Sequence, residues 1–239
     1  MKELEDHEYF PSVLRNFQTD YIGFVVSAFK VYNAFIQHIK TIAMPSPIMS
    51  DLCSGSGEPA ISIFRESNCF KYLTFSDKYP NELGLCDNNI SYKIERADVI
   101  TMEFKPHKCY TMFNAFHHFT DEDKLFITQK IQASGAAAFI VEILEPTITC
   151  MLKVLFTSTL GSLLFMPFVK PFSITRLFFT YIIPINVFTI TFDGVVSVFK
   201  SRSADHYRKL FTGCSDTIEV FRLKNGISPL IVIQINIPT

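Results

Sequence analysis

A regular alternation of short apolar runs with more polar, helix-like stretches occupies residues 45–145 and most constrains the fold of this chain. The apolar runs end in glycine or polar residues, which is how strands followed by loops are marked in a sequence. The stretches between them carry apolar residues at helical spacing. Such an alternation predicts a parallel sheet with helices on both faces. The five predicted strands lie within residues 47–57, 71–80, 91–99, 109–119 and 135–144.

The last part of the chain predicts an antiparallel hairpin. Residues 217–223 and 229–237 are two apolar runs, and between them Asn225-Gly226 is the strongest short-range signal for a hairpin turn. Together with the five earlier strands, this predicts an α/β fold. Its sheet is Rossmann-like, doubly wound, seven-stranded and mostly parallel, and it ends in the antiparallel hairpin.

Two further segments lie outside this alternation. Residues 1–44 contain one or two predicted helices and form an N-terminal helical cap. Residues 146–193 are a strongly apolar insertion, predicted as a second part of the cap. The core is then formed by residues 45–145 and 194–239 within a single domain, which suits a chain of 239 residues.

Charge and composition exclude several classes of protein. With 22 basic and 23 acidic residues the formal net charge is −1, so the chain has no bulk attraction for nucleic acid. An apolar fraction of 48% excludes disorder. The six cysteines form no C-x-x-C pair, and we predict free thiols in a reducing compartment and no metal site. The acidic start of the sequence resembles no secretory signal, so we expect a cytoplasmic protein.

The insertion contains two uncharged stretches of 16 residues, 154–169 and 177–192. Each is shorter than the ~20 residues of a membrane-spanning helix. Pro167, Pro171 and Pro184 interrupt this region further. We therefore do not expect two spanning helices. We expect residues 146–192 to form either a closed apolar cap or a peripheral contact with the inner face of a membrane.

A glycine-rich loop follows the first predicted strand. Asp51 ends the strand, Gly55 and Gly57 lie in the turn, and a helix begins directly afterwards. Only glycine lets the main chain approach a ligand so closely, and the start of a helix offers free N–H donors. About 20 residues later the second strand ends at Asp77, where open α/β sheets place a carboxylate for ribose hydroxyls.

The third and fourth predicted strands also end in polar residues. Asp98 follows the third strand, and Asn114, His117 and His118 follow the fourth. Because ligands of open α/β sheets bind beyond the carboxyl ends of the strands, these side chains are expected to converge on one cleft.

With these motifs, the chain resembles the class I S-adenosylmethionine-dependent methyltransferases over residues 45–145 and the closing hairpin. Its loop D-L-C-S-G-S-G-E-P has Cys53 in place of the family's first glycine. The run F-N-A-F-H-H-F is closer to small-molecule methyltransferases than to the N-P-P-Y type that acts on nucleic acid.

The resemblance implies S-adenosylmethionine as cofactor and a role for each matching residue. Asp51 would orient the amino group of the methionine moiety, with Gly55 and Gly57 beneath the ligand. The remaining cofactor-binding residues would be Cys53 in the loop, Asp77 at the ribose hydroxyls and Lys78 next to it, Asp98 and Val99 at the adenine, and Asn114 and Phe116 beside the methyl donor.

The implied function is methyl transfer to a hydrophobic small molecule or lipid-like acceptor. A protonated acceptor needs a general base, and His118 and the isolated acid Asp193 are the candidates. Two alternatives stay open. Residues 55–60 also fit the G-x-G-x-x-A pattern of an NAD-linked oxidoreductase, and the chain could be a non-catalytic nucleoside-binding module.

Overall fold

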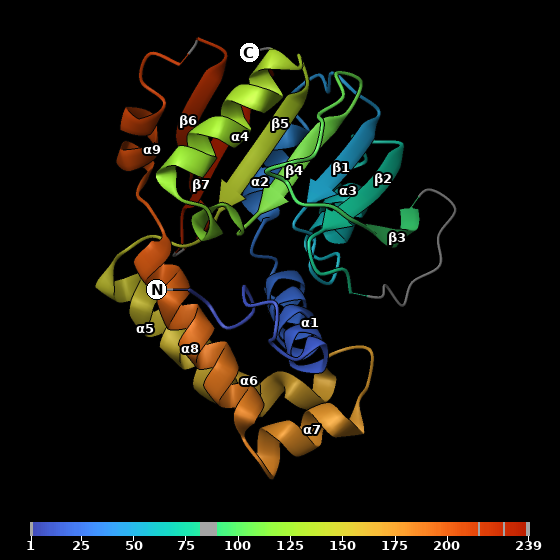
Figure 1. The fold of residues 1–239 in the computed structure, drawn as a ribbon, viewed down its shortest axis with the longest axis vertical. Helices are drawn as coiled ribbons and strands as arrows, with labels where there is room; N and C mark the ends of the chain where they lie inside the picture. Colours follow the sequence, from blue (N-terminus) through green and yellow to red (C-terminus); the bar gives the residue numbers. More distant parts are fainter. Residues whose placement is uncertain (1, 82–89, 215, 227, 238–239) are drawn as a thin grey trace.

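The computed structural model describes residues 2–81, 90–214, 216–226 and 228–237. Its centre is a seven-stranded sheet with the strand order β3-β2-β1-β4-β5-β7-β6 (Figure 1). The first five strands are parallel, and β7 runs antiparallel to both β5 and β6. This confirms the predicted fold class, including the C-terminal hairpin. The strands are β1 (Ile48–Leu52), β2 (Tyr72–Asp77), β3 (Ile90–Arg96), β4 (Cys109–Phe113), β5 (Ala137–Glu142), β6 (Ile218–Leu223) and β7 (Leu230–Ile235).

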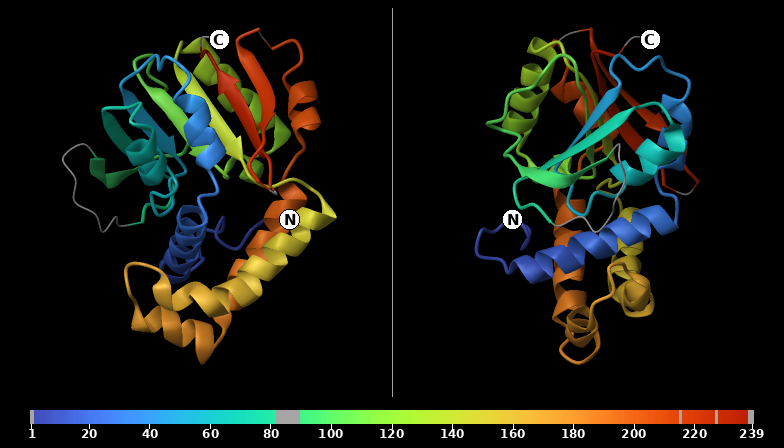
Figure 2. Two further views of the ribbon diagram at one scale, coloured as in Figure 1. Left: turned by 180° about the vertical axis from the view of Figure 1, so that it is seen from behind. Right: turned by 90° about the vertical axis from the view of Figure 1, so that its right-hand side faces the viewer.

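Helices cover both faces of the sheet (Figure 2). On one face α2 (Asn33–Ile39) and α3 (Ala60–Ser67) share an apolar core with the strands. On the other face α4 (Asp121–Ala133) and α9 (Ala204–Leu210) form a second core. The strands β4, β5 and β7 contribute side chains to both cores, which explains why their sequences are mostly apolar.

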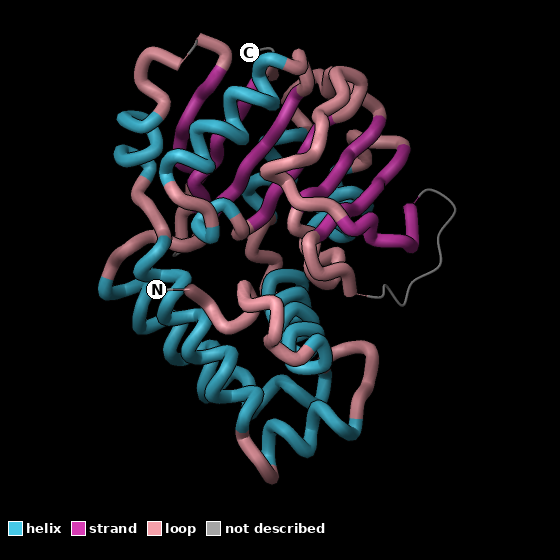
Figure 3. Tube along the Cα trace, in the orientation of Figure 1, coloured by secondary structure: helices cyan, strands magenta, loops and turns pink. Residues whose placement is uncertain are grey.

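The cap lies beyond the carboxyl ends of the strands, and Figure 3 shows loops gathered between it and the sheet. It contains α1 (Ser12–Ala28) and a continuous helical stretch of α5 (Ile148–Phe156), a π-helical turn (Thr157–Gly161), α6 (Ser162–Phe165) and a 3₁₀ turn (Met166–Phe168). The helices α7 (Ile174–Tyr181) and α8 (Ile185–Lys200) complete it, and α8 packs against both α5 and α1.

The segment boundaries differ from the predicted ones in two places. The helix α2 belongs to the core, because Phe35, Ile36 and Ile39 are buried against the sheet, so only the earlier part of residues 1–44 caps the cleft. The helix α8 continues through the predicted boundary at residues 193/194 and ends at Lys200. Helical periodicity shows which face of a helix is apolar, but it does not show which surface covers that face.

The apolar insertion exposes much of its apolar surface. Residues 148–168 form 21 residues of helix that are long and apolar enough to cross a membrane, and only 17% of their most apolar window is buried. The expectation of a shorter, proline-broken segment was wrong here, because Pro167 lies at the very end of this helix. The pair α7 and α8 also passes this test together, but it is bent by 78°.

Candidate functional site

A cleft of about 670 Å³ lies between the ends of β1 to β4 and the cap. All four predicted strand ends contribute to it, as expected for an open α/β sheet. The first residues of the chain, α1 and the end of α8 close its other side. Of the residues predicted from the sequence, it is lined by Cys53, Gly55, Asp77, Lys78, Asp98, Val99, Asn114 and His118.

The glycine-rich loop is held by the second strand and covered by α1. The backbone N–H of Gly55 donates to Asp77 Oδ2 at 2.9 Å, and the φ of Gly55 is +51°. Cys53 adopts a similar left-handed φ of +54°, which explains why glycine suits this position in the family. A Cβ on Gly23 of α1 would lie 2.4 Å from Ser56 Oγ, so α1 sits directly on the loop.

Two acids at the next strand ends face the cleft. Asp77 also accepts from the N–H of Tyr79 at 2.8 Å, so both of its oxygens organise backbone around the cleft. Asp98 accepts from the N–H of Ile100 at 3.0 Å and pairs with Lys78 Nζ at 3.0 Å. Burial alone would raise the pKa of Asp98, but these two partners outweigh it and lower the pKa below its usual value.

The side chain of Asn114 has a buried oxygen atom without a hydrogen-bond donor among the described residues. Its backbone is left-handed, with a φ of +49°, and its N–H donates to Val141 O at 2.8 Å. Its side-chain Oδ1 is buried, and no group in the described part of the chain donates to it. Because an unpaired buried acceptor is costly, Oδ1 points to a hydrogen-bonding ligand in the cleft.

Three predicted cofactor-binding residues lie below the cleft rather than on it. Phe116 is fully buried in the second core and stacks on Tyr207, so it supports the cleft from behind. Gly57 is also buried, and its φ of +85° turns the chain into α3. Asp51 is 3% exposed and accepts from Thr111 Oγ1 at 2.8 Å, since these two residues are opposite each other on β1 and β4.

Burial gives Asp51 an unusual titration. Removal from water raises its pKa to about 8, in spite of the hydrogen bond from Thr111. Because the folded pKa lies above the unfolded one, the protonated acid stabilises the fold fully below about pH 4, and this contribution is lost as the pH rises to about 8.

We therefore expect Asp51→Asn to stabilise the ligand-free protein at high pH. Asparagine keeps an acceptor for Thr111 and has no proton to lose. The difference in free energy of unfolding, variant minus parent, should grow from near zero at pH 4 to at least about 2 kcal/mol at pH 8. Denaturant unfolding at a series of pH values measures this difference. A difference that stays constant across the range contradicts the raised pKa.

His118 is surrounded by acids from the start of the chain. Its Nδ1 lies 2.9 Å from Asp6 Oδ1, and its Nε2 lies 3.4 Å from Glu3 Oε2 and 3.7 Å from Glu5 Oε1. Burial alone would lower the pKa of His118, but these carboxylates outweigh it and raise the pKa to about 9. Both ring nitrogens then carry protons at neutral pH. The role of general base stays a prediction, and these surroundings argue against it.

Within the residues that the structure describes, a carboxylate engages only one ring nitrogen of His117, whereas carboxylates lie beside both ring nitrogens of His118. It also lines the cleft, is only 1% exposed, and its Nδ1 lies 2.8 Å from Glu142 Oε2. Glu142 is fixed in turn by the N–H of Phe116, which donates to Oε1 at 2.8 Å. With Nδ1 engaged by the carboxylate, Nε2 is the nitrogen left for a ligand. The sequence placed His117 at the cleft but did not select it as the base, because its partner lies 25 residues further on, in a different strand.

The structure does not bring Asp193, the other predicted base, to the cleft. Its Oδ1 accepts from the N–H of Leu4 at 2.6 Å, and its Oδ2 accepts from the N–H of Glu5 and from Gln18 Nε2. Burial raises its pKa to about 6. Asp193 therefore ties the first residues of the chain to α8, and acts on the cleft only by holding Glu5 beside it.

Comparisons with known proteins support the fold. No family model and no curated protein matches the sequence. Human N-acetylserotonin methyltransferase, solved in complex with SAM, is 13% identical with a TM-score of 0.51, over 93% of this chain and 52% of that one. The chain thus spans about half the length of that enzyme. The plantazolicin methyltransferase BpumL, solved with SAH, is 11% identical with a TM-score of 0.50, over 95% of this chain and 96% of that one.

The strand order separates this fold from the NAD-linked alternative. In the dinucleotide-binding Rossmann fold a sixth parallel strand lies beside the fifth. Here the antiparallel strand β7 lies between β5 and β6 instead. Together with the solved structures, this arrangement shows that the chain has the fold of the class I S-adenosylmethionine-dependent methyltransferases.

Proposed function

We propose that the protein transfers a methyl group from S-adenosylmethionine to a hydrophobic small molecule or lipid-like acceptor. One observation carries this proposal: the glycine-rich loop, Asp77, Asp98 and Asn114 all reach one cleft at the carboxyl edge of a methyltransferase-type sheet. A non-catalytic nucleoside-binding module would need the same cleft, so turnover is what separates the two.

The described residues fit the cofactor. Asp77 keeps lone pairs for ribose hydroxyls after accepting from two backbone N–H groups. Asp98 and the backbone around Val99 offer an acceptor and a donor for adenine. The unpaired Oδ1 of Asn114 can accept from the amino group of the methionine moiety. When bound, the cofactor supplies an electrophilic methyl group, and the protein mainly aligns the acceptor with it.

Binding of S-adenosylhomocysteine tests the cofactor. The intact chain should bind it in calorimetry and gain thermal stability, and NADH should give neither effect. Asp77→Ala should weaken binding by about 1–3 kcal/mol, since it removes charge-assisted hydrogen bonds to ligand and loop. Asp205→Ala, an exposed acid on α9, is the matched control and should bind normally. Unchanged affinity in Asp77→Ala would remove this carboxylate from the proposed site.

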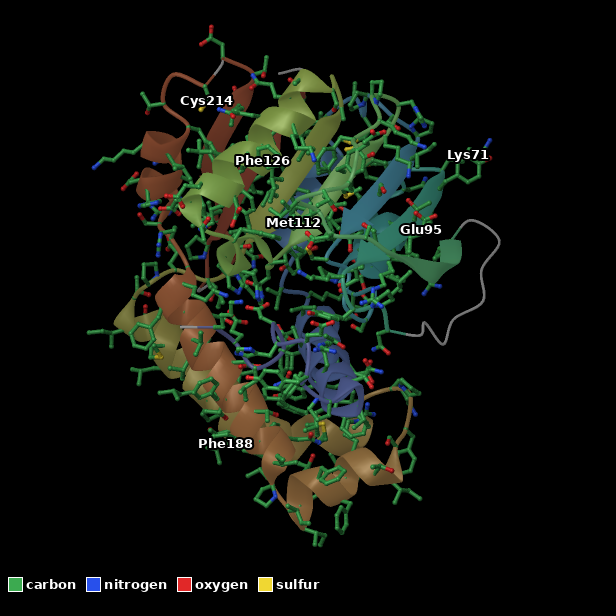
Figure 4. The ribbon with its side chains drawn as sticks, in the orientation of Figure 1. Lys71, Glu95, Met112, Phe126, Phe188 and Cys214 are labelled. Atoms are coloured by element: carbon green, nitrogen blue, oxygen red, sulfur yellow. The ribbon has the colours of Figure 1, made fainter. Side chains whose placement is uncertain are left out.

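The cap supports an apolar acceptor and contact with a membrane surface. The exposed residues Ile148, Leu152, Phe156, Leu160 and Leu164 recur every fourth position, so they form one stripe along the helix. More exposed apolar residues follow in α7 and α8, among them Phe188, which is labelled in Figure 4. A surface of this size on a monomer calls for a partner, and a lipid surface fits its lack of charge.

The proposed location is the cytoplasmic face of a membrane. The five described cysteines are free thiols, which suits a reducing compartment. The net charge of −1 gives no reason to expect a nucleic-acid partner. Incubation with labelled S-adenosylmethionine and a lipid extract, followed by chromatography of the lipids, is the experiment that identifies the acceptor.

A further inference from the structure

Side chains from the start of the chain and from the end of β4 meet at the edge of the cleft. Glu3, His117 and His118 each offer one ligand atom, and these three atoms lie within 4.8 Å of one another. We propose that they bind a divalent transition-metal ion of the zinc type. Two histidines and a glutamate are a ligand set that holds catalytic zinc, with a fourth position open to a small molecule.

The distances are close to those that a zinc site needs. Bonds of about 2.0–2.2 Å place the ligand atoms of a tetrahedral zinc site roughly 3–4 Å apart. Glu3 Oε2 and His118 Nε2 are already 3.4 Å apart. Since Glu142 occupies Nδ1 of His117, Nε2 is the nitrogen that His117 would offer to the ion. Side-chain rotations that bring all three atoms from within 4.8 Å to this spacing would close the site.

Each proposed ligand is already oriented by a second group. His117 Nδ1 lies 2.8 Å from Glu142, and His118 Nδ1 lies 2.9 Å from Asp6. Glu3 directs its other oxygen, Oε1, to Lys200 Nζ at 3.0 Å. Carboxylates behind both histidines are the usual arrangement around protein metal sites, because they fix the ring and leave the other nitrogen for the metal.

The surrounding charge also favours a cation. Glu3, Glu5 and Asp6 come together around His118, and Glu142 lies behind His117. Lys200 is paired with two of these acids, Glu3 and Asp6. A divalent ion that replaces the proton on His118 Nε2 would take over the neutralisation of these buried carboxylates.

The role of the ion rests on the proposed function, although its binding does not. His117 and His118 both line the cleft, so an acceptor hydroxyl in it would be able to bind the metal and lose its proton to water. The acceptor oxygen then attacks the methyl carbon, and the carbon–sulfur bond breaks with its electron pair remaining on sulfur. The products are the methylated acceptor and neutral S-adenosylhomocysteine.

Zinc titration of the untagged, chelator-treated full chain tests the site. Calorimetry should show one equivalent of Zn²⁺, and Co²⁺ should give the visible absorption of a tetrahedral site. His118→Ala and Glu3→Gln should each weaken Zn²⁺ binding by at least about 100-fold, and Asp6→Asn by roughly 10-fold or more. His206→Ala is the matched control, because His206 also pairs with an aspartate, Asp121, but on the surface.

The outcomes separate this inference from the proposed function. Equal Zn²⁺ affinity in the parent, His118→Ala and Glu3→Gln, with all three folded by circular dichroism, would overturn the metal site. If S-adenosylhomocysteine also binds in that case, the proposed function stands and His117 acts without a metal. If Zn²⁺ binds as expected but S-adenosylhomocysteine does not, the metal site stands and the proposed function fails.

Discussion

Replacing His117 with asparagine should slow methyl transfer by ~10²–10⁴-fold and leave the affinity for S-adenosylhomocysteine unchanged. Asparagine can still donate to Glu142 from about the position of Nδ1, so the buried carboxylate keeps its partner. It lacks Nε2, the atom that would take the acceptor's proton or bind the metal. Transfer of label from S-adenosylmethionine measures the first effect, and calorimetry measures the second.

His107→Asn is the control for this experiment, because His107 lies in the loop before β4 at the opposite end of that strand. Addition of a chelator then separates the two roles of Nε2. A metal-dependent parent enzyme should lose turnover with the chelator and regain it with Zn²⁺, whereas a simple base should be insensitive. Near-full turnover in His117→Asn would contradict both roles and leave alignment alone as the source of catalysis.

The sequence predicted the sheet well because its signals are local. Most strands are short apolar runs, and Asn225-Gly226 identifies the closing hairpin. Polar residues at Asp77, Asp98 and Asn114 predicted the cleft, since parallel strands present their carboxyl ends at one edge.

The acceptor side of the cleft was harder to predict because its contacts are non-local. Glu3 and Asp6 reach His118 from the start of the chain, and no spacing rule links positions more than a hundred residues apart. Asp193 is an isolated charge in apolar sequence, which suggested a catalytic role. Its carboxylate instead accepts hydrogen bonds from the backbone N–H groups of Leu4 and Glu5. No sequence pattern indicates such a long-range contact.

Changing the apolar stripe of the cap should release the protein from lipid. The variant Leu152→Gln, Phe156→Gln and Leu160→Gln removes three side chains that are 52–60% exposed. Burying each half-exposed side chain in lipid contributes roughly 1 kcal/mol, so the triple change should weaken partition into vesicles by about 100-fold. Flotation with vesicles of phosphatidylcholine, with and without an anionic lipid, measures the partition.

Phe126→Gln is the control, because Phe126 is similarly exposed but lies on α4, beside the sheet (Figure 4). Its partition should not change, and all variants should bind S-adenosylhomocysteine equally, since the stripe faces away from the cleft. A parent protein that stays soluble with both vesicle types and elutes at twice its mass would contradict the lipid proposal. A second copy of the chain would then cover the stripe.

The packing of the cap argues for contact along the surface rather than passage through it. One side of the helical stretch 148–168 exposes the stripe, while α5 packs against α8 on its other side. The helix α8 carries Asp193, whose carboxylate holds the first residues of the chain beside the cleft. Drawing residues 148–168 across a bilayer would separate α5 from α8 or take that carboxylate into lipid, at a cost of several kcal/mol. With the stripe at the interface, both contacts persist and the cleft stays within reach of the lipid surface.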